Sequence, residues 1–229
     1  MNNVFLYGKN SADIEPLILG AGFTIVKENP DFIISYGGDG TMMKAEAEFP
    51  GIPKILLRNS QICKKCSILS NPDVLTRVRE GRYTIEKLMK LQIQAGDKIL
   101  HGINDIIIHN QDARHAIRYS VQVNDKNIGS EIIGDGLVIA TPFGSTGYYR
   151  SITDSYFELG IGLAFNNSTE QSDHIVLKED SVIKINIVRG PIIIYADNQS
   201  DEIIISEKEH VVVSKSPLIA QVVIPTVRG

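Results

Sequence analysis

Apolar and polar positions alternate differently in the two parts of this chain. In the first part, short apolar runs alternate with segments of helical spacing, which is typical of a parallel sheet covered by helices. We therefore expect an α/β domain over residues 1–82. The expected strands are residues 4–7, 23–26, 32–36 and 52–57, and the expected helices are residues 12–19, 42–48 and 72–81.

From residue 83 onward, short apolar runs follow one another with turn residues between them, and only residues 146–158 have helical character. This pattern predicts a β-rich domain of two packed sheets, a β-sandwich, over residues 83–215. The expected strands are residues 88–94, 103–109, 117–123, 138–140, 182–188, 192–195, 202–205 and 211–213. The remaining tail, residues 216–229, is too apolar to stay in water, so we expect it to pack back on the first domain.

Composition narrows the class of protein without naming a function. The 229 residues are 43% hydrophobic and 22% charged, which is ordinary globular usage. No apolar run is long enough to span a bilayer and the first residues carry no basic segment, so we expect a cytoplasmic protein without a membrane partner. With a net charge of −4, no nucleic-acid partner is expected. An anionic ligand would have to be held by local cations, backbone N–H groups or a metal.

The first candidate site is the segment Gly-Gly-Asp-Gly-Thr, residues 37–41, which follows the expected strand 32–36 and precedes a helix. A glycine-rich turn between a strand and a helix presents backbone N–H groups to a phosphate. Glycine permits positive φ angles and removes the Cβ atoms that would keep a phosphate away. Asp39 is unexpected there, because it would repel a phosphate unless it holds Mg²⁺ or takes a proton from a hydroxyl. The alternative is a tight turn in which Asp39 caps the helix.

The two cysteines, Cys63 and Cys66, lie in Cys-Lys-Lys-Cys. One such pair supplies half of a tetrahedral zinc site. We expect two free loop thiols, with zinc or a disulfide shared across a dimer as the alternative. On this view, changing both cysteines to serine leaves turnover and melting temperature close to wild type.

The second candidate site is Gly-Asp-Gly-Leu-Val-Ile-Ala-Thr-Pro-Phe-Gly-Ser-Thr-Gly-Tyr-Tyr, residues 134–149, in which a strand opens into a second glycine loop. Ser145 or Thr146 could cap a helix or bond a ligand. Asn104 and Asp105 stand at the start of another apolar run. An amide beside a carboxylate there is either a turn signal or a pair that binds a sugar, since a carboxylate can accept both hydroxyls of a ribose.

These blocks, in this order, resemble the NAD kinase family (ATP or polyphosphate NAD kinases), and Asp197-Asn198-Gln199 resembles the Asp-Gly-Gln turn of that family. Gly-Gly-Asp-Gly-Thr alone is less specific, since phosphofructokinases and lipid kinases share it. The resemblance implies phosphoryl transfer to the 2′-hydroxyl of the adenosine ribose of NAD, giving NADP. It also implies an α/β domain and a β-sandwich with NAD between them, ATP with Mg²⁺ at the first glycine turn, and a homo-oligomer, either dimer or tetramer.

The resemblance also assigns roles residue by residue. Asp39 matches the general base. The resemblance implies that Mg²⁺ is held through the phosphates, and Asp39 is the one protein side chain that could also bind it. The residues assigned to ATP phosphates are Gly37, Gly38, Gly40, Thr41 and, as a candidate cation, Lys44. The residues assigned to NAD are Asn104, Asp105, Asp135, Thr146, Gly147, Tyr148 and Ser151.

Several positions depart from the family pattern. Phe143 replaces the usual Thr or Ser, and Gly147 stands where Ala is usual. The family segment Asn-x-Gly-x-Leu-Gly-Phe is missing after residue 55, with Asn59 as its remnant and the cysteine pair in its place.

Two competing functions also fit the sequence: a nucleotide-binding regulator without turnover, and a kinase that acts on another sugar or a lipid. Lys44 and Arg150 are either phosphate-binding cations or surface residues, and His174 reads as a solvated loop histidine. The sequence does not decide between ATP and polyphosphate as donor, or between NAD and NADH as acceptor.

Overall fold

The structure, a computed structural model, describes residues 2–9, 11–61, 63–169 and 173–227. The chain divides into two compact units, which are described separately. The first unit contains Met1–Leu88 and Leu218–Gly229, and the second contains Met89–Pro217. The sequence had placed these boundaries after residues 82 and 215.

The first unit is built on a parallel sheet. Its strands are β1 (Asn3–Tyr7), β2 (Thr24–Ile25), β3 (Phe32–Gly37), β4 (Lys54–Arg58) and the last part of β16 (His210–Pro225), in the order β2-β1-β3-β4-β16. Because β3 and β4 are buried on both faces, they read as continuous apolar runs. Val222 of the tail pairs with Lys54, so the apolar tail is buried as an added strand.

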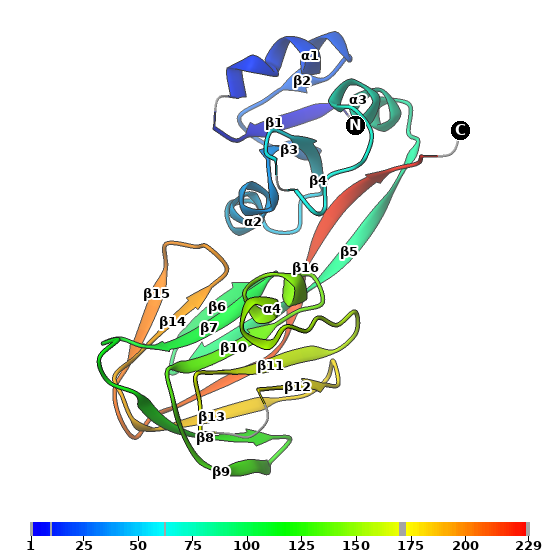
Figure 1. Ribbon diagram of the computed structural model, residues 1–229. Coiled ribbons are helices and arrows are strands. Elements are labelled where there is room, and N and C mark those ends of the chain that lie inside the picture. The colour runs from blue at the N-terminus through cyan, green and yellow to red at the C-terminus, as the bar shows by residue number, and fades with distance from the viewer. Residues whose placement is uncertain (1, 10, 62, 170–172, 228–229) are drawn as a thin grey trace. The chain divides into compact units, whose positions relative to one another are not determined.

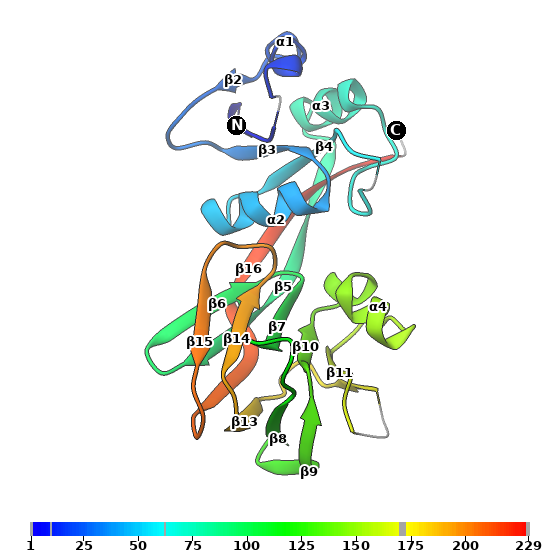
Figure 2. The same ribbon diagram turned by 60° about the vertical axis from the view of Figure 1, so that its left-hand side comes forward.

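Helices cover both faces of this sheet: α1 (Glu15–Gly20) and α3 (Asn71–Arg79) lie on one side and α2 (Asp39–Glu48) on the other (Figure 1 and Figure 2). Alternate strand residues such as Phe32 and Ile34 pack with Ile18 of α1 and Leu75 of α3. The hydroxyl of Ser70 caps α3 by accepting a hydrogen bond from the Asp73 N–H.

The second unit contains two sheets. One has the order β12-β11-β10-β7-β14-β15; in the other, the first part of β16 pairs with β13, β13 with β8 and β8 with β9, while β5 pairs with β16 and β6. The strands are β5 (Tyr83–Ala95), β6 (Lys98–Gly102), β7 (Asp105–Asn110), β8 (Ile117–Val123), β9 (Lys126–Gly134), β10 (Gly136–Ala140), β11 (Ile161–Asn166), β12 (His174–Leu177), β13 (Ile183–Arg189), β14 (Ile192–Ala196) and β15 (Glu202–Ile205).

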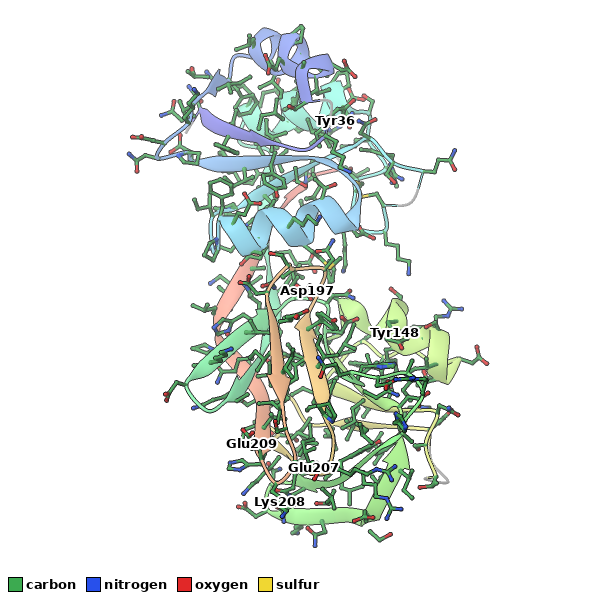
Figure 3. All side chains as sticks on the ribbon, turned by 90° about the vertical axis from the view of Figure 1, so that its left-hand side faces the viewer. Tyr36, Tyr148, Asp197, Glu207, Lys208 and Glu209 are labelled. Carbon is green, nitrogen blue, oxygen red and sulfur yellow. A yellow bond between two sulfur atoms is a disulfide. The ribbon has the colours of Figure 1, made fainter. Side chains whose placement is uncertain are left out.

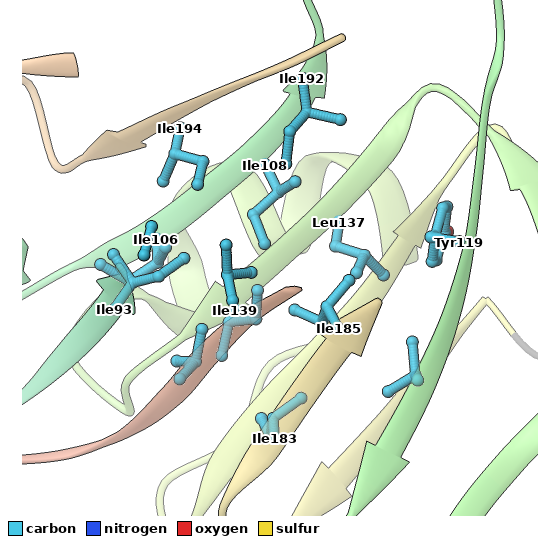
Figure 4. Packing of buried hydrophobic residues seen from close by; sticks show 14 of the residues in the cluster. Ile93, Ile106, Ile108, Tyr119, Leu137, Ile139, Ile183, Ile185, Ile192 and Ile194 are labelled. Carbon is cyan, nitrogen blue, oxygen red and sulfur yellow. The ribbon is translucent and has the colours of Figure 1, made fainter. Parts of the chain in front are cut away.

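One hydrophobic cluster joins the two sheets of the second unit. Ile106, Leu137 and Ile194 come from the first sheet, and Tyr119 and Ile185 from the second (Figure 4). Each strand contributes every second residue to this core, as the alternation of apolar and polar residues predicts. A short 3₁₀ turn (Gly144–Thr146) and helix α4 (Tyr148–Thr153) follow β10, and Tyr149 of α4 packs on Val138 and Ala164.

The prediction of a strand-rich second part is thus confirmed, whereas several element bounds differ from expectation. Strands β6, β9, β11 and β12 were not predicted, and the expected helix 146–158 is shorter. Among the described residues, no helix has both the length and the apolar character needed to cross a membrane.

A buried ion pair ties α2 to β4 in the first unit. The side chains of Lys54 and Glu46 are 0% and 2% exposed, and the Lys54 ammonium donates to the Glu46 carboxylate and, at 2.6 Å, to the Phe49 carbonyl. Removing one partner of a buried pair leaves the other charge uncompensated.

We therefore predict that Glu46→Ala lowers the free energy of unfolding by about 3–5 kcal/mol, measured by urea unfolding. The double variant Glu46→Leu with Lys54→Met should recover most of that loss. The matched control is Glu179→Ala, which breaks an exposed pair with Lys215 and should cost at most about 1 kcal/mol. Equal losses for Glu46→Ala and Glu179→Ala would contradict the prediction.

Candidate functional site

The first glycine segment joins β3 directly to α2. Strand β3 ends at Gly37 and α2 begins at Asp39, so Asp39 is the first helical residue and lies three residues before the predicted helix start. The φ of Gly38 is −119°, and none of the three segment glycines is among the described residues with positive φ, so the expected use of left-handed backbone is wrong here. Gly37 is needed for space: a Cβ atom there would lie 2.1 Å from Thr41 Oγ1.

The Asp39 carboxylate faces the loop that carries the cysteines. Its Oδ2 accepts a hydrogen bond from the Lys64 backbone N–H at 3.0 Å, and its Oδ1 accepts one from the Lys65 N–H at 3.2 Å. Each carboxylate oxygen keeps further acceptor capacity, because an ionised carboxylate offers about four lone-pair positions. Asp39 is therefore held in place by a segment distant in sequence, whereas the alternative reading made it a cap of its own helix.

The cysteines form a disulfide within the chain, Cys63–Cys66, with the two Cα atoms 5.4 Å apart. The expectation of two free thiols is therefore wrong, and so is a disulfide shared across a dimer. The physical reason is local: a turn over Lys64 and Lys65 brings the two Cα atoms within disulfide range. The loop is tied to β4 by Arg58, whose Nη2 donates to the Cys63 carbonyl at 3.1 Å.

The other residues predicted to bind phosphate have local roles in this structure. The Thr41 N–H donates to the Gly38 carbonyl at 3.0 Å, and the Gly37 carbonyl accepts from the Asn59 N–H at 3.1 Å. Lys44 is exposed on α2. Phosphate binding by Gly37, Gly38, Gly40, Thr41 and Lys44 stays a prediction.

In the second unit, the loop after β10 closes over Asn104. The Thr141 N–H donates to the Asn104 carbonyl at 3.0 Å, and the Thr141 hydroxyl donates to the Ile103 carbonyl at 2.6 Å. A Cβ atom on Gly144 would lie 1.9 Å from the Asn104 carbonyl oxygen, and one on Gly147 would lie 3.3 Å from Asn104 Nδ2. The glycines of this loop therefore let it approach Asn104 closely.

Asp197, in the turn after β14, fixes the same backbone from another direction. Its carboxylate accepts three backbone N–H groups, from Ile103 at 2.9 Å, Asn104 at 2.7 Å and Asp105 at 3.1 Å. The Asp197 N–H in turn donates to the Asp105 carbonyl at 3.0 Å. A Cβ atom on Gly102 would lie 2.7 Å from that carbonyl and 3.0 Å from Asp197 Oδ1, so a glycine is needed there. Figure 3 labels Asp197, in the turn between β14 and β15, and Tyr148, at the start of α4.

The Asp105 side chain is buried, with 3% of the residue exposed, and its Oδ2 accepts a 2.7 Å hydrogen bond from Asn104 Nδ2. Burial, and then the charge of Asp197, raise the pKa of Asp105 to about 7 against the lowering effect of the Asn104 bond. Burial also raises the pKa of Asp197, opposed by the three backbone N–H groups and by Lys90. The hydrogen bond to Asp105 fixes the orientation of the Asn104 amide. Because its pKa is raised to about 7, Asp105 titrates near neutral pH.

Not every predicted residue joins this cluster. Gly136 pairs with His109 and Ala140 with Asp105, so Asn104 is level with Thr141 and Asp135 lies at the opposite end of β10, about 20 Å away for six extended steps. The Asp135 carboxylate there accepts a hydrogen bond from Asn167 at 3.0 Å. The sequence analysis grouped Asp135 with the glycine loop because both adjoin strand β10. Since β10 is extended, Asp135 and the loop lie at its opposite ends.

The remaining predicted residues lie on or near α4. The Tyr148 hydroxyl accepts from Asn166 at 3.2 Å, and the Ser151 hydroxyl donates to the Tyr148 carbonyl at 2.7 Å. Thr146 is half-buried and Gly147 is exposed. Arg150 stacks on Tyr156, 5.8 Å from the ring centroid. His174 pairs with Asp173 at 2.7 Å.

The two clusters offer different chemistry. The first unit presents one carboxylate, Asp39, at the start of a helix beside a glycine-rich segment. The second presents an amide and a carboxyl group, Asn104 and Asp105, beside a glycine loop and a tyrosine, which suits a ligand with sugar hydroxyls and a planar base. Sequence reasoning named Asp197 as part of a motif and missed its role in holding Asn104 and Asp105.

Comparison with known proteins agrees with this chemistry. Residues 103–224 match the family model described as the ATP-NAD kinase C-terminal domain. An NAD kinase of Saccharophagus degradans is 27% identical over 212 residues, covering 86% of this chain and 71% of that protein. An NAD kinase of Saccharolobus solfataricus is 31% identical over 134 residues. That match spans only about half, 53%, of the Saccharolobus protein and 58% of this chain.

Two solved structures have the same fold. An NAD kinase from Archaeoglobus fulgidus in complex with ATP aligns with a TM-score of 0.79 and 18% identity, covering 97% of this chain and 93% of its own. Yeast NADH kinase complexed with NADH aligns with a TM-score of 0.79 and 17% identity, covering 100% of this chain and 84% of its own.

The raised pKa of Asp105 gives a prediction about pH and stability. The folded chain keeps this proton up to about pH 7, whereas the unfolded chain releases it near 3.8. The folded state thus binds the proton more tightly, so the free energy of unfolding contributed by this group falls as pH rises from about 4 to about 7. Asp105→Asn, which cannot ionise, should remove that fall.

Two measurements check this. Urea unfolding at about pH 5 and about pH 8 should show a smaller stability difference in Asp105→Asn than in wild type. The ¹³C carboxyl signal of Asp105 should titrate with a midpoint near 7, and Asp197→Asn should lower that midpoint because it removes a neighbouring negative charge. A midpoint near 4 in the wild-type chain would show that the carboxyl is not desolvated.

Proposed function

The chain belongs to the NAD kinase family, and we propose that it transfers a phosphoryl group from ATP to the 2′-hydroxyl of the adenosine ribose of NAD, forming NADP. The observation that carries the proposal is the Asn104–Asp105 pair enclosed by the glycine loop and backed by Asp197, all within the region that matches the family model. Polyphosphate remains the alternative donor, and NADH the alternative acceptor.

The second unit supplies the proposed contacts with NAD. The Asn104 amide is oriented by Asp105, and the Asp105 carboxylate accepts ribose hydroxyls when it is ionised. The adenine of NAD is proposed to contact the loop after β10 and the start of α4, at Thr146, Gly147, Tyr148 and Ser151. Gly147 suits this role because it is exposed and approaches the Asn104 amide closely. Asp135 lies at the far end of β10, so we do not assign it a ligand contact.

The first unit supplies Asp39 and the glycine-rich segment for the phosphates of ATP. Phosphoryl transfer depends mainly on positioning and on stabilising the charge of the transferring group. Asp39 would orient or deprotonate the acceptor hydroxyl, because its carboxylate has acceptor capacity beyond the two backbone bonds it already receives. Lys44 is a candidate cation for the phosphates because it lies four residues, about one turn, after Gly40 of the glycine-rich segment in α2.

The residues present fit Mg²⁺ only when it binds together with the triphosphate of ATP. Within the described ranges, no group of three or more His, Cys, Asp or Glu side chains could hold a metal ion. Proteins commonly bind Mg²⁺ through one or two carboxylates together with substrate phosphates, and Asp39 is the carboxylate of the glycine-rich segment. When bound, Mg²⁺ neutralises charge on the phosphates.

The finer architecture and setting are part of the proposal. We regard the first unit as a parallel α/β domain and the second as a β-sandwich, with domain boundaries near residues 82 and 215 as the sequence suggested. The proposed protein is a cytoplasmic homo-oligomer, a dimer or tetramer, that acts on small-molecule nucleotides without nucleic-acid or membrane partners.

A second candidate is a nucleotide-binding regulator on the same scaffold without turnover. Asp39 favours the enzyme, because a carboxylate beside a phosphate site weakens simple anion binding and acts usefully only on a hydroxyl or a metal. The absence of the family segment after residue 55 favours the regulator, since the cysteine loop stands in its place.

The deciding experiment is a coupled assay for NADP formed from NAD, ATP and Mg²⁺, with polyphosphate and NADH as parallel reactants. We predict turnover by the wild-type chain and a loss of at least about a hundredfold in kcat for Asp39→Asn, because general-base catalysis contributes about 10²–10⁴-fold. NAD affinity should hardly change, since the interaction is made in the transition state.

The matched control is Asp31→Asn in the same unit. The Asp31 carboxylate also accepts two backbone N–H groups, from Asn2 at 2.8 Å and Asn3 at 3.0 Å, so the substitution makes the same chemical change in an aspartate bonded to backbone away from Asp39. Asp31→Asn should keep wild-type kcat. If the wild-type chain bound NAD and ATP yet formed no NADP, the regulator would be the better description.

A further inference from the structure

The carboxylate of Asp39 is oriented by a feature that departs from the family pattern. The side chain leaves the first residue of α2 and is met by two consecutive backbone N–H groups, those of Lys64 and Lys65. Both residues lie inside the four-residue loop that the disulfide Cys63–Cys66 closes. The donors are main-chain groups, so their direction depends on the conformation of the loop and not on the lysine side chains.

The disulfide also contacts the catalytic segment directly. Cys63 Sγ lies 3.5 Å from Asp39 Oδ1, and Cys66 Sγ lies 4.0 Å from the Gly37 carbonyl oxygen. These are packing contacts, because a disulfide sulfur carries no proton to donate. Cys63 is buried, with 7% of the residue exposed, so the loop is seated against the segment that bears Asp39.

The disulfide restricts the backbone of this loop. It contains no regular secondary structure, and two neighbouring N–H groups point at one carboxylate only in a narrow range of backbone conformations. The cross-link removes most of the alternatives, in the way that closing a loop lowers the entropy of its open forms. The Arg58 guanidinium, bound to the Cys63 carbonyl, anchors one end of the loop to β4.

We propose that Cys63 and Cys66 are positioning residues: their disulfide holds the Lys64 and Lys65 amides on the Asp39 carboxylate and so keeps Asp39 aimed at the acceptor hydroxyl. This inference rests on the proposed function for its effect on turnover, while the positioning itself does not. It reverses the expectation that the cysteine pair is dispensable.

Reduction by a dithiol provides the test. The dithiol breaks the Cys63–Cys66 bond, each sulfur gains one proton and one electron, and the reagent closes into its own cyclic disulfide. We expect kcat for NADP formation to fall at least about tenfold, because a displacement of about 1 Å can cost up to about a hundredfold. The KM for NAD should stay within about twofold, and reoxidation should restore kcat.

The double variant Cys63→Ser with Cys66→Ser should show the same reduced kcat and no further response to the dithiol, which controls for effects of the reagent on the assay. Thiol alkylation confirms that the wild-type disulfide has opened. Unchanged kcat in the reduced, alkylated chain would overturn the proposal. So would a fall in kcat that follows only general unfolding in circular dichroism, since that marks a structural role.

Backbone hydrogen exchange of Lys64 and Lys65 separates this inference from the proposed function. In the oxidised chain both amides should exchange slowly, and they should exchange at least about tenfold faster after reduction or in Asp39→Asn. If the oxidised chain formed no NADP, the proposed function would fail, and this exchange alone would still decide whether the loop positions Asp39. Equal exchange in the oxidised and reduced chains would overturn the positioning role.

Discussion

The candidate dinucleotide site depends on one carboxylate, that of Asp197. An ionised carboxyl group removed from water is costly unless its oxygens accept hydrogen bonds. Three consecutive backbone N–H groups, from Ile103 to Asp105, meet that requirement. The same bonds fix the backbone that carries the Asn104 amide and the Asp105 carboxyl group. The hydrogen bonds that stabilise the Asp197 carboxylate therefore also determine the geometry of the site. The negative charge of Asp197 also helps burial to raise the pKa of Asp105 to about 7, so the Asp105 carboxyl group changes its protonation near neutral pH.

The Asp39 carboxylate in the first unit is also held by backbone N–H groups. Its oxygens also accept consecutive backbone N–H groups, from Lys64 and Lys65, although here a disulfide closes the donor loop. Backbone donors orient a carboxylate without adding a side chain that would compete for a ligand. A carboxylate so fixed loses less freedom when it meets a substrate, which is how enzymes reduce the entropic part of a barrier.

The sequence predicted the strand-rich second part and singled out the candidate site segments because both depend on side-chain pattern. The apolar run of β3 and the glycines after it indicated a strand and a helix start, and Asn104 and Asp105 stood out as polar residues at a strand entrance. Strand β9 escaped prediction because glycines and polar residues interrupt its apolar pattern, and β11 because Gly162 stands within a short apolar run. The partners of Asp39 and Asp197 escaped it because they are backbone N–H groups, which every residue except proline carries. The disulfide was missed because a spacing of three fits free thiols, zinc and a bond equally well.

The most direct test of this account is the affinity for NAD of Asp197→Asn, measured by titration calorimetry beside Asp201→Asn. Asp201 is exposed and follows in the same connection between β14 and β15, so the chemical change is matched. Asp197→Asn would remove the negative charge, and the new amide N–H would face the Ile103 N–H that donates to Asp197 Oδ2, so the backbone from Ile103 to Asp105 should lose its fixed geometry. We predict that Asp197→Asn binds NAD at least about tenfold more weakly than wild type, in line with about 1.5–3 kcal/mol for a hydrogen bond to a charged group. Asp201→Asn should bind NAD as wild type does. Equal NAD affinity in Asp197→Asn and wild type would contradict the account.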